Sequence, residues 1–61
     1  MPVIEVSVVE GHSKGEKRNL IETVSKATAE SLNIPMEWVQ IVIRETPKSE
    51  WGKGGKPISE L

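Results

Sequence analysis

The sequence predicts a small α/β protomer in which two parallel strands flank one helix and a short C-terminal β-hairpin follows. Residues 2–9 and 39–45 alternate apolar with more polar side chains, and the segment between them has helical periodicity. A connection this long makes the strands parallel, with a right-handed crossover. At 61 residues, we expect a single domain, 1–61.

The first predicted strand, residues 2–9, is rich in β-branched side chains. One face carries only apolar side chains, and the other is half polar. We therefore expect a helix over one face and a partner subunit over the other. The apolar face consists of Pro2, Ile4, Val6 and Val8.

A helix is predicted from Ser13 to Asn33. Ser13 with Glu16 three residues later fits a capping box, and Asn33 suits a C-terminal cap. Pro35 cannot continue this helix but suits the start of a separate single turn at 35–38. The helix has about five turns, with Lys17 on its polar side and an apolar stripe of Leu20, Ile21, Val24, Ala27, Thr28, Ser31 and Leu32.

The second predicted strand, residues 39–45, has Val39, Ile41 and Ile43 on one face and a mixed face that includes Gln40 and Arg44. The following segment, 46–57, is dense in glycine and proline, which predicts a hairpin. Residues 57–61 are too short to stand alone, so we expect them to fray or to pack on a neighbouring subunit.

Composition excludes several classes of function. Eight Lys and Arg against nine Asp and Glu give a net charge of −1, unlike a basic nucleic-acid binder. The absence of cysteine and the single histidine, His12, argue against a thiolate or zinc centre. No apolar run approaches the roughly 20 residues of a membrane span, and the N-terminus lacks a signal-peptide pattern, so we expect a cytoplasmic protein. Because so short a chain builds a thin core, oligomerisation is expected.

Pro2 is the first candidate catalytic residue. A methionine before proline is expected to be removed, which would leave a secondary amine at the start of a rigid strand. An apolar pocket disfavours the charged form of an amine, and a neutral amine near pH 7 can act as a general base. The alternative is that Pro2 merely follows Met1 and has a structural role.

Several segments together resemble the 4-oxalocrotonate tautomerase family over essentially the whole chain. They are Pro2 before a β-branched strand, Glu10-Gly11, the helix with Leu20-Ile21 and Val24, and Trp51-Gly52-Lys53-Gly54-Gly55. The resemblance implies a βαβ protomer that dimerises and usually forms a hexamer, a trimer of dimers, without a cofactor. It also implies keto–enol tautomerisation of a small unsaturated acid, with the N-terminal proline as general base.

The resemblance also assigns substrate-binding positions. Trp51 stands at the family's aromatic position, while His12 and Gln40 replace two arginines that bind substrate carboxylates. Arginine offers a charged bidentate fork, which neither histidine nor glutamine reproduces. We expect His12 and Gln40 to donate hydrogen bonds to substrate oxygens, with weak activity on dicarboxylates and better activity on monoacid enols.

Pro2 and His12 lie at opposite ends of the first predicted strand, up to about 30 Å apart at roughly 3.3 Å per residue. A pocket containing both must therefore lie between subunits. Three other interpretations remain: dehalogenation of unsaturated acids, hydration of such acids, or a non-catalytic oligomeric module. Arg44, four residues after Gln40, is predicted to be a solvated or interface charge.

Overall fold

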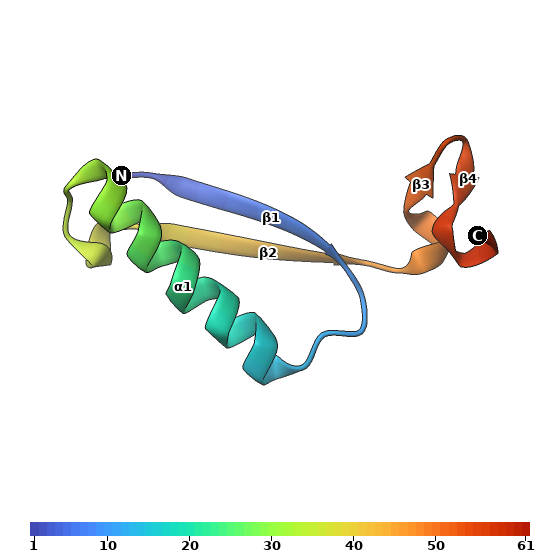
Figure 1. Ribbon diagram of the computed structural model, residues 1–61, viewed down its shortest axis with the longest axis horizontal. Coiled ribbons are helices and arrows are strands. Elements are labelled where there is room, and N and C mark those ends of the chain that lie inside the picture. Colours follow the sequence, from blue (N-terminus) through green and yellow to red (C-terminus); the bar gives the residue numbers. More distant parts are fainter.

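In a computed structural model that describes all 61 residues, the chain forms one long helix, two long strands and a small hairpin (Figure 1). The order is β1 (Val3–Val9), α1 (Lys14–Leu32), β2 (Gln40–Thr46), β3 (Gly52–Lys53) and β4 (Lys56–Pro57). Three 3₁₀ turns join or end these elements: η1 (Met36–Trp38), η2 (Lys48–Glu50) and η3 (Ile58–Glu60).

β1 and β2 form a two-stranded parallel sheet, which confirms the predicted βαβ arrangement. The register runs from Val3 opposite Gln40 to Val9 opposite Thr46. β2 begins one residue later than predicted because the Val39 N–H donates to the Met36 carbonyl and closes η1. The outer edge of each strand has no partner within the chain, so both edges can pair with another chain.

Both ends of α1 have the predicted caps. The Glu16 N–H donates to Ser13 Oγ at 3.1 Å, and the Ser13 N–H donates to Glu16 Oε1 at 2.9 Å. Asn33 adopts the left-handed conformation with φ 54°, and its N–H donates to the carbonyls of Ala29 and Glu30. These bonds satisfy backbone groups that a helix leaves unpaired at its ends.

The predicted apolar stripe of α1 is only partly correct. Ala29, which was not assigned to it, is the one buried residue of the chain at 8% exposure. Lys17, assigned to the polar side, is half-buried, whereas Ile21 and Leu32 are exposed. The apolar stripe of α1 is wider than the surface that the two strands offer for packing. Part of the stripe is therefore exposed to solvent in the single protomer.

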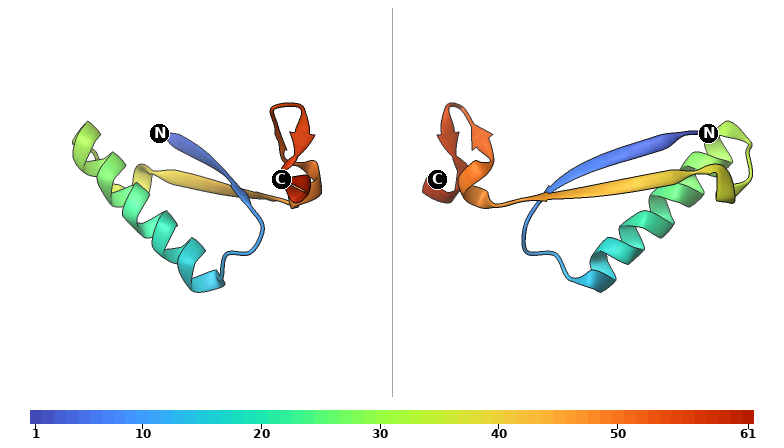
Figure 2. Two further views of the ribbon diagram at one scale, coloured as in Figure 1. Left: turned by 45° about the vertical axis from the view of Figure 1, so that its right-hand side comes forward. Right: turned by 180° about the vertical axis from the view of Figure 1, so that it is seen from behind.

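The C-terminal hairpin stands apart from the βαβ unit, beyond the end of β2 (Figure 2). Gly54 and Gly55 form its two-residue turn with φ of 63° and 88°, values that suit glycine. The radius of gyration is 14.4 Å, against about 10 to 11 Å for a compact chain of this length. Residues 57–61 do not fray, because the Ile58 N–H donates to the Trp51 carbonyl at 2.8 Å and Ile58–Glu60 form η3; the expected packing on a neighbouring subunit stays a prediction.

The core of the protomer is thin. Apart from Ala29, the apolar side chains are half-buried or exposed, and Val3 and Val42 are exposed on the sheet face opposite α1. No helix of the structure is both long and apolar enough to cross a membrane. Much of the apolar surface that could stabilise the fold is therefore left for contact with other chains.

Candidate active site

Pro2 and Gln40 lie together at the end of the sheet where both strands begin. The Gln40 N–H donates to the Pro2 carbonyl at 3.0 Å, which fixes the backbone at Pro2. The Pro2 side chain is half-buried, whereas Met1 is 80% exposed. The N-terminus lies at the same end of the molecule as the end of α1 and the connection to β2 (Figure 1). Met1 thus extends into solvent, while Pro2 is held by its neighbours.

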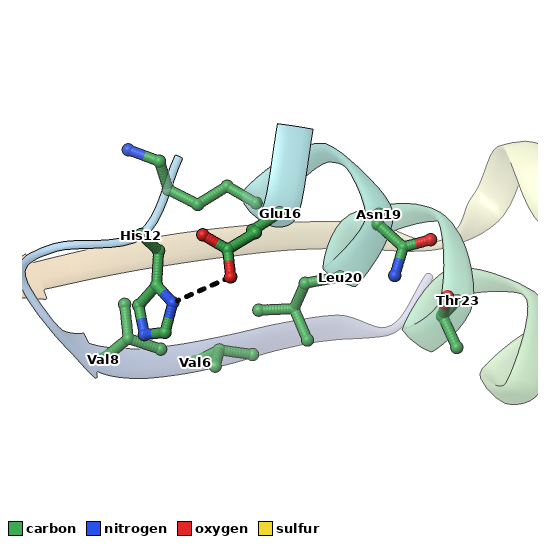
Figure 3. A pocket seen from close by; sticks show the side chains of 8 residues that line it. Val6, Val8, His12, Glu16, Asn19, Leu20 and Thr23 are labelled. Carbon is green, nitrogen blue, oxygen red and sulfur yellow. Dashed lines mark ion pairs between the residues drawn. The ribbon is translucent and has the colours of Figure 1, made fainter. Parts of the chain in front are cut away.

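His12 lies at the other end of β1, at the mouth of a groove between β1 and the first half of α1 (Figure 3). The groove has a volume of about 490 Å³. Val6, Val8 and Leu20 form its apolar wall. The imidazole is half exposed, so one side of the ring is open to a ligand or to another chain.

Glu16 contacts the imidazole and also caps the helix. Its Oε2 lies 3.8 Å from His12 Nδ1, while its Oε1 accepts the Ser13 N–H. Hydrogen bonds with Ser13 lower the pKa of the Glu16 carboxyl below its ordinary value, and nearby His12 adds to this effect. The capping role was predicted from sequence, but the contact with His12 was not. Because His12 precedes the helix, helical spacing does not apply to it, and its place directly before the cap residue Ser13 was the available signal.

Trp51 follows η2 at the base of the hairpin. Its N–H donates to the Lys48 carbonyl at 3.4 Å, and its own carbonyl accepts the Ile58 N–H. The side chain is half-buried. Trp51 therefore lies beyond the C-terminal end of β2, whereas Gln40 lies at the N-terminal end of the same strand.

The four predicted site residues thus fall at two ends of the protomer. Pro2 and Gln40 share one end, and His12 and Trp51 lie at or beyond the other (Figure 1). The length of β1 separates Pro2 from His12 within the chain. A pocket that contains residues from both ends requires at least two chains.

Two ion pairs involve the remaining charged residues of the sheet. Lys17 Nζ lies 2.6 Å from Glu45 Oε1, and Arg44 lies 3.4 Å from Glu5 Oε1. The Arg44 side chain is 63% exposed in the protomer, so it is open either to solvent or to another chain. No group of three or more His, Asp or Glu side chains converges as a metal site would require.

Comparison with known proteins assigns the chain to a class. The sequence model of the tautomerase enzyme family matches residues 2–61. A 2-hydroxymuconate tautomerase of Pseudomonas putida is 43% identical over 61 residues, which cover 100% of this chain and 97% of the relative. A probable tautomerase of Halalkalibacterium halodurans is 38% identical over 60 residues, 98% of each chain. The chain belongs to the tautomerase family, a family of isomerases.

Solved structures confirm the resemblance to 4-oxalocrotonate tautomerases and the βαβ fold with its C-terminal hairpin. Apo unfused 4-oxalocrotonate tautomerase superimposes with a TM-score of 0.96 at 31% identity, over 100% of both chains. A heterohexameric 4-oxalocrotonate tautomerase from Chloroflexus aurantiacus has a TM-score of 0.96 at 31% identity, over 100% of this chain and 98% of that chain.

Proposed function

We propose that this isomerase is a cofactor-independent keto–enol tautomerase in which the secondary amine of Pro2, exposed by removal of Met1, is the general base. The observation that carries the proposal is the position of Pro2. It is the first residue matched by the family, it directly precedes β1, and the Gln40 N–H fixes its backbone. A base held in this way is already oriented before substrate binds.

The proposed reaction moves one proton. The Pro2 nitrogen takes the proton from the enol hydroxyl, and the oxygen's electron pair forms the carbonyl double bond. The electron pair of the carbon–carbon double bond moves along the conjugated system and takes a proton from the resulting Pro2 ammonium. The amine is regenerated, and no redox change occurs.

The proposed site lies between chains of a homo-oligomer. The separation of Pro2 from His12, the single buried residue and the unpaired strand edges all support such an assembly. Structural relatives include a heterohexamer and an asymmetric trimer. We propose a hexamer built as a trimer of dimers, in which each pocket takes Pro2 from one chain and His12 from another.

The proposed substrate is a 2-hydroxy or 2-oxo unsaturated acid with one carboxylate. Curated relatives are 2-hydroxymuconate tautomerases, whose named substrate is a dicarboxylate. In this chain, the neutral amide of Gln40 and the imidazole of His12 occupy the two proposed substrate-binding positions. Because neither provides a bidentate cation, we propose weaker activity on dicarboxylates than on a monoacid enol such as phenylenolpyruvate. Trp51 would supply the apolar wall.

The deciding experiment follows phenylenolpyruvate ketonisation by ultraviolet absorbance, with protein whose mass shows that Met1 is absent. We expect turnover above buffer that is lost in Pro2→Ala. Pro47→Ala is the matched control, because Pro47 is an exposed proline at the far end of β2 and should leave turnover in place.

Persistent turnover in Pro2→Ala would exclude the amine as base. If processed protein is inactive on enols but releases halide from a halogenated unsaturated acid, the dehalogenase interpretation replaces this one. Addition of water to an unsaturated acid would indicate the hydratase. Inactivity in all three assays, with the oligomer intact, would favour the non-catalytic module.

A further inference from the structure

In the groove at His12, the carboxylate of Glu16 lies beside the imidazole and can affect how His12 binds a substrate. Glu16 Oε1 is held by the Ser13 N–H at 2.9 Å, so its carboxylate is fixed by the helix cap. The second oxygen, Oε2, faces His12 Nδ1 at 3.8 Å. Figure 3 shows the other ring nitrogen pointing away from Glu16. One carboxylate thus both caps α1 and faces the ring.

Glu16 is the charged group that acts on the imidazole here. Lys17 also lines the groove, but its ammonium is paired with Glu45 at 2.6 Å. The distance of 3.8 Å is longer than a hydrogen bond. Because the ring is half exposed, a small rotation of its side chain can bring Nδ1 into hydrogen-bond range of the fixed carboxylate.

A carboxylate beside one ring nitrogen determines where a neutral imidazole carries its proton. Neutral imidazole has one N–H donor and one acceptor nitrogen, and an ionised carboxylate can only accept. The hydrogen bond made by one nitrogen therefore decides the state of the other. With Nδ1–H directed at Glu16, the nitrogen left for the substrate is an acceptor.

We propose that Glu16 is a positioning residue that holds neutral His12 as the Nδ1–H tautomer, so that Nε2 offers a substrate a lone pair. This inference rests on the proposed function, in which His12 faces the substrate. It reverses the hydrogen-bond direction expected from the sequence at this position. Nε2 then presents only a lone pair, so a second carboxylate of a substrate finds no donor there, while the enol proton remains available to Pro2. Glu16 thereby disfavours substrates with a second carboxylate.

Glu16→Gln is a sharp test because glutamine also fits a capping box. Its carbonyl can accept the Ser13 N–H, which leaves its amide N–H₂ facing His12 Nδ1 as a donor. The tautomer should then invert, with Nε2 becoming the N–H. Glu16→Ala also removes the charge but offers Nδ1 neither a donor nor an acceptor, so it separates loss of charge from reversal of the hydrogen bond.

The direct readout is the nitrogen-15 spectrum of the imidazole in mildly alkaline buffer. The chain has one histidine, so the two ring signals are unambiguous. We expect Nδ1–H in the parent, Nε2–H in Glu16→Gln and an intermediate mixture in Glu16→Ala. Unchanged far-ultraviolet circular dichroism in Glu16→Gln would show that the helix is retained. The same tautomer in all three proteins would overturn the proposal.

The kinetic readout compares KM for a dicarboxylic enol with KM for a monoacid enol. Glu16→Gln should lower this ratio severalfold more than Glu16→Ala does, with the change in KM rather than kcat. Equal changes in the two variants would mean that charge alone acts, and would overturn the positioning role. The nitrogen-15 result does not depend on turnover. Loss of the proposed function would therefore appear separately, as absence of Pro2-dependent activity.

Discussion

Lys17 Nζ lies 2.6 Å from Glu45 Oε1 and joins the first turn of α1 to the end of β2. The Lys17 side chain is only 28% exposed, so the pair is better shielded from water than a typical surface ion pair. This contact holds the start of the helix against the sheet in a protomer that has little other core there.

Replacing Lys17 with methionine should keep the packing of the side-chain stem and remove the ion pair. We expect a loss of about 0.5–1 kcal/mol in the free energy of unfolding, the upper range for exposed pairs. Urea denaturation at equal protomer concentration measures it. Arg44→Met is the control, because the Arg44–Glu5 pair is longer and more exposed and should contribute less. An equal loss of unfolding free energy in both variants would show that shielding from water does not strengthen the Lys17–Glu45 pair.

Acid should weaken the start of α1 through Glu16. The pKa of Glu16 is lowered in the folded chain by hydrogen bonds with Ser13, so its contribution to stability is fully present above the unfolded-state pKa. That contribution is lost as the pH falls through the lower, folded-state pKa. Helicity followed by circular dichroism during acid titration should therefore fall more steeply in the parent than in Glu16→Gln. Parallel curves would show that the carboxylate does not contribute to acid sensitivity.

Two glycines near His12 should respond oppositely to alanine. Gly11 has φ 118°, which alanine rarely adopts, so Gly11→Ala should cost about 1–3 kcal/mol and displace His12. Gly15 lies inside α1, where an added Cβ would meet Ser13 Oγ at an ordinary 3.9 Å. Gly15→Ala should therefore stabilise the chain by roughly 0.5–1 kcal/mol. Thermal denaturation measures the stability of both variants. Stabilisation by Gly11→Ala would argue against the positive φ at Gly11.

Arginine at either proposed substrate-binding position should improve binding of a second carboxylate. Charge-assisted hydrogen bonds exceed neutral ones by about 1 kcal/mol or more, so His12→Arg and Gln40→Arg should each lower KM for a dicarboxylic enol by roughly fivefold or more. Steady-state kinetics with 2-hydroxymuconate and phenylenolpyruvate measure the change.

Glu30→Gln changes the net charge by the same amount on an exposed position of α1 and serves as the control. An equal fall in KM in Glu30→Gln would show that overall charge causes the effect. An unchanged KM in both arginine variants would show that His12 and Gln40 do not line the proposed pocket.

Local signals were sufficient to predict most of the fold. The capping box of Ser13 and Glu16, the cap at Asn33 and the alternation of both strands each depend on neighbours within a few residues. The orientation of α1 was less predictable. Ala29 packs inward and Ile21 outward because two strands cover only part of the apolar stripe, and the width of that cover is a tertiary property.

The place of each candidate site residue in the fold was predictable from the sequence, but the contacts between their side chains were not. Pro2 and Gln40 meet because the strands are parallel, which the long connection predicted. The contact of Glu16 with His12 depends on side-chain conformations at the helix start, which periodicity does not specify. The packing of Ile58 against the Trp51 backbone likewise depends on the path of the hairpin.

The separation of Pro2 and His12 by the length of β1 has a genetic consequence under the proposed site. Each chain then contributes Pro2 to one pocket and His12 to another. A substitution of Pro2 and a substitution of His12 in the same chain therefore affect two different pockets. Subunits carrying Pro2→Ala and subunits carrying His12→Ala, each impaired alone, would regain activity when unfolded and reassembled together. Some pockets of the mixture would receive an intact Pro2 from one parent and an intact His12 from the other. Intragenic complementation of this kind would let two diverged copies of the gene each lose one half of the site and still support catalysis together.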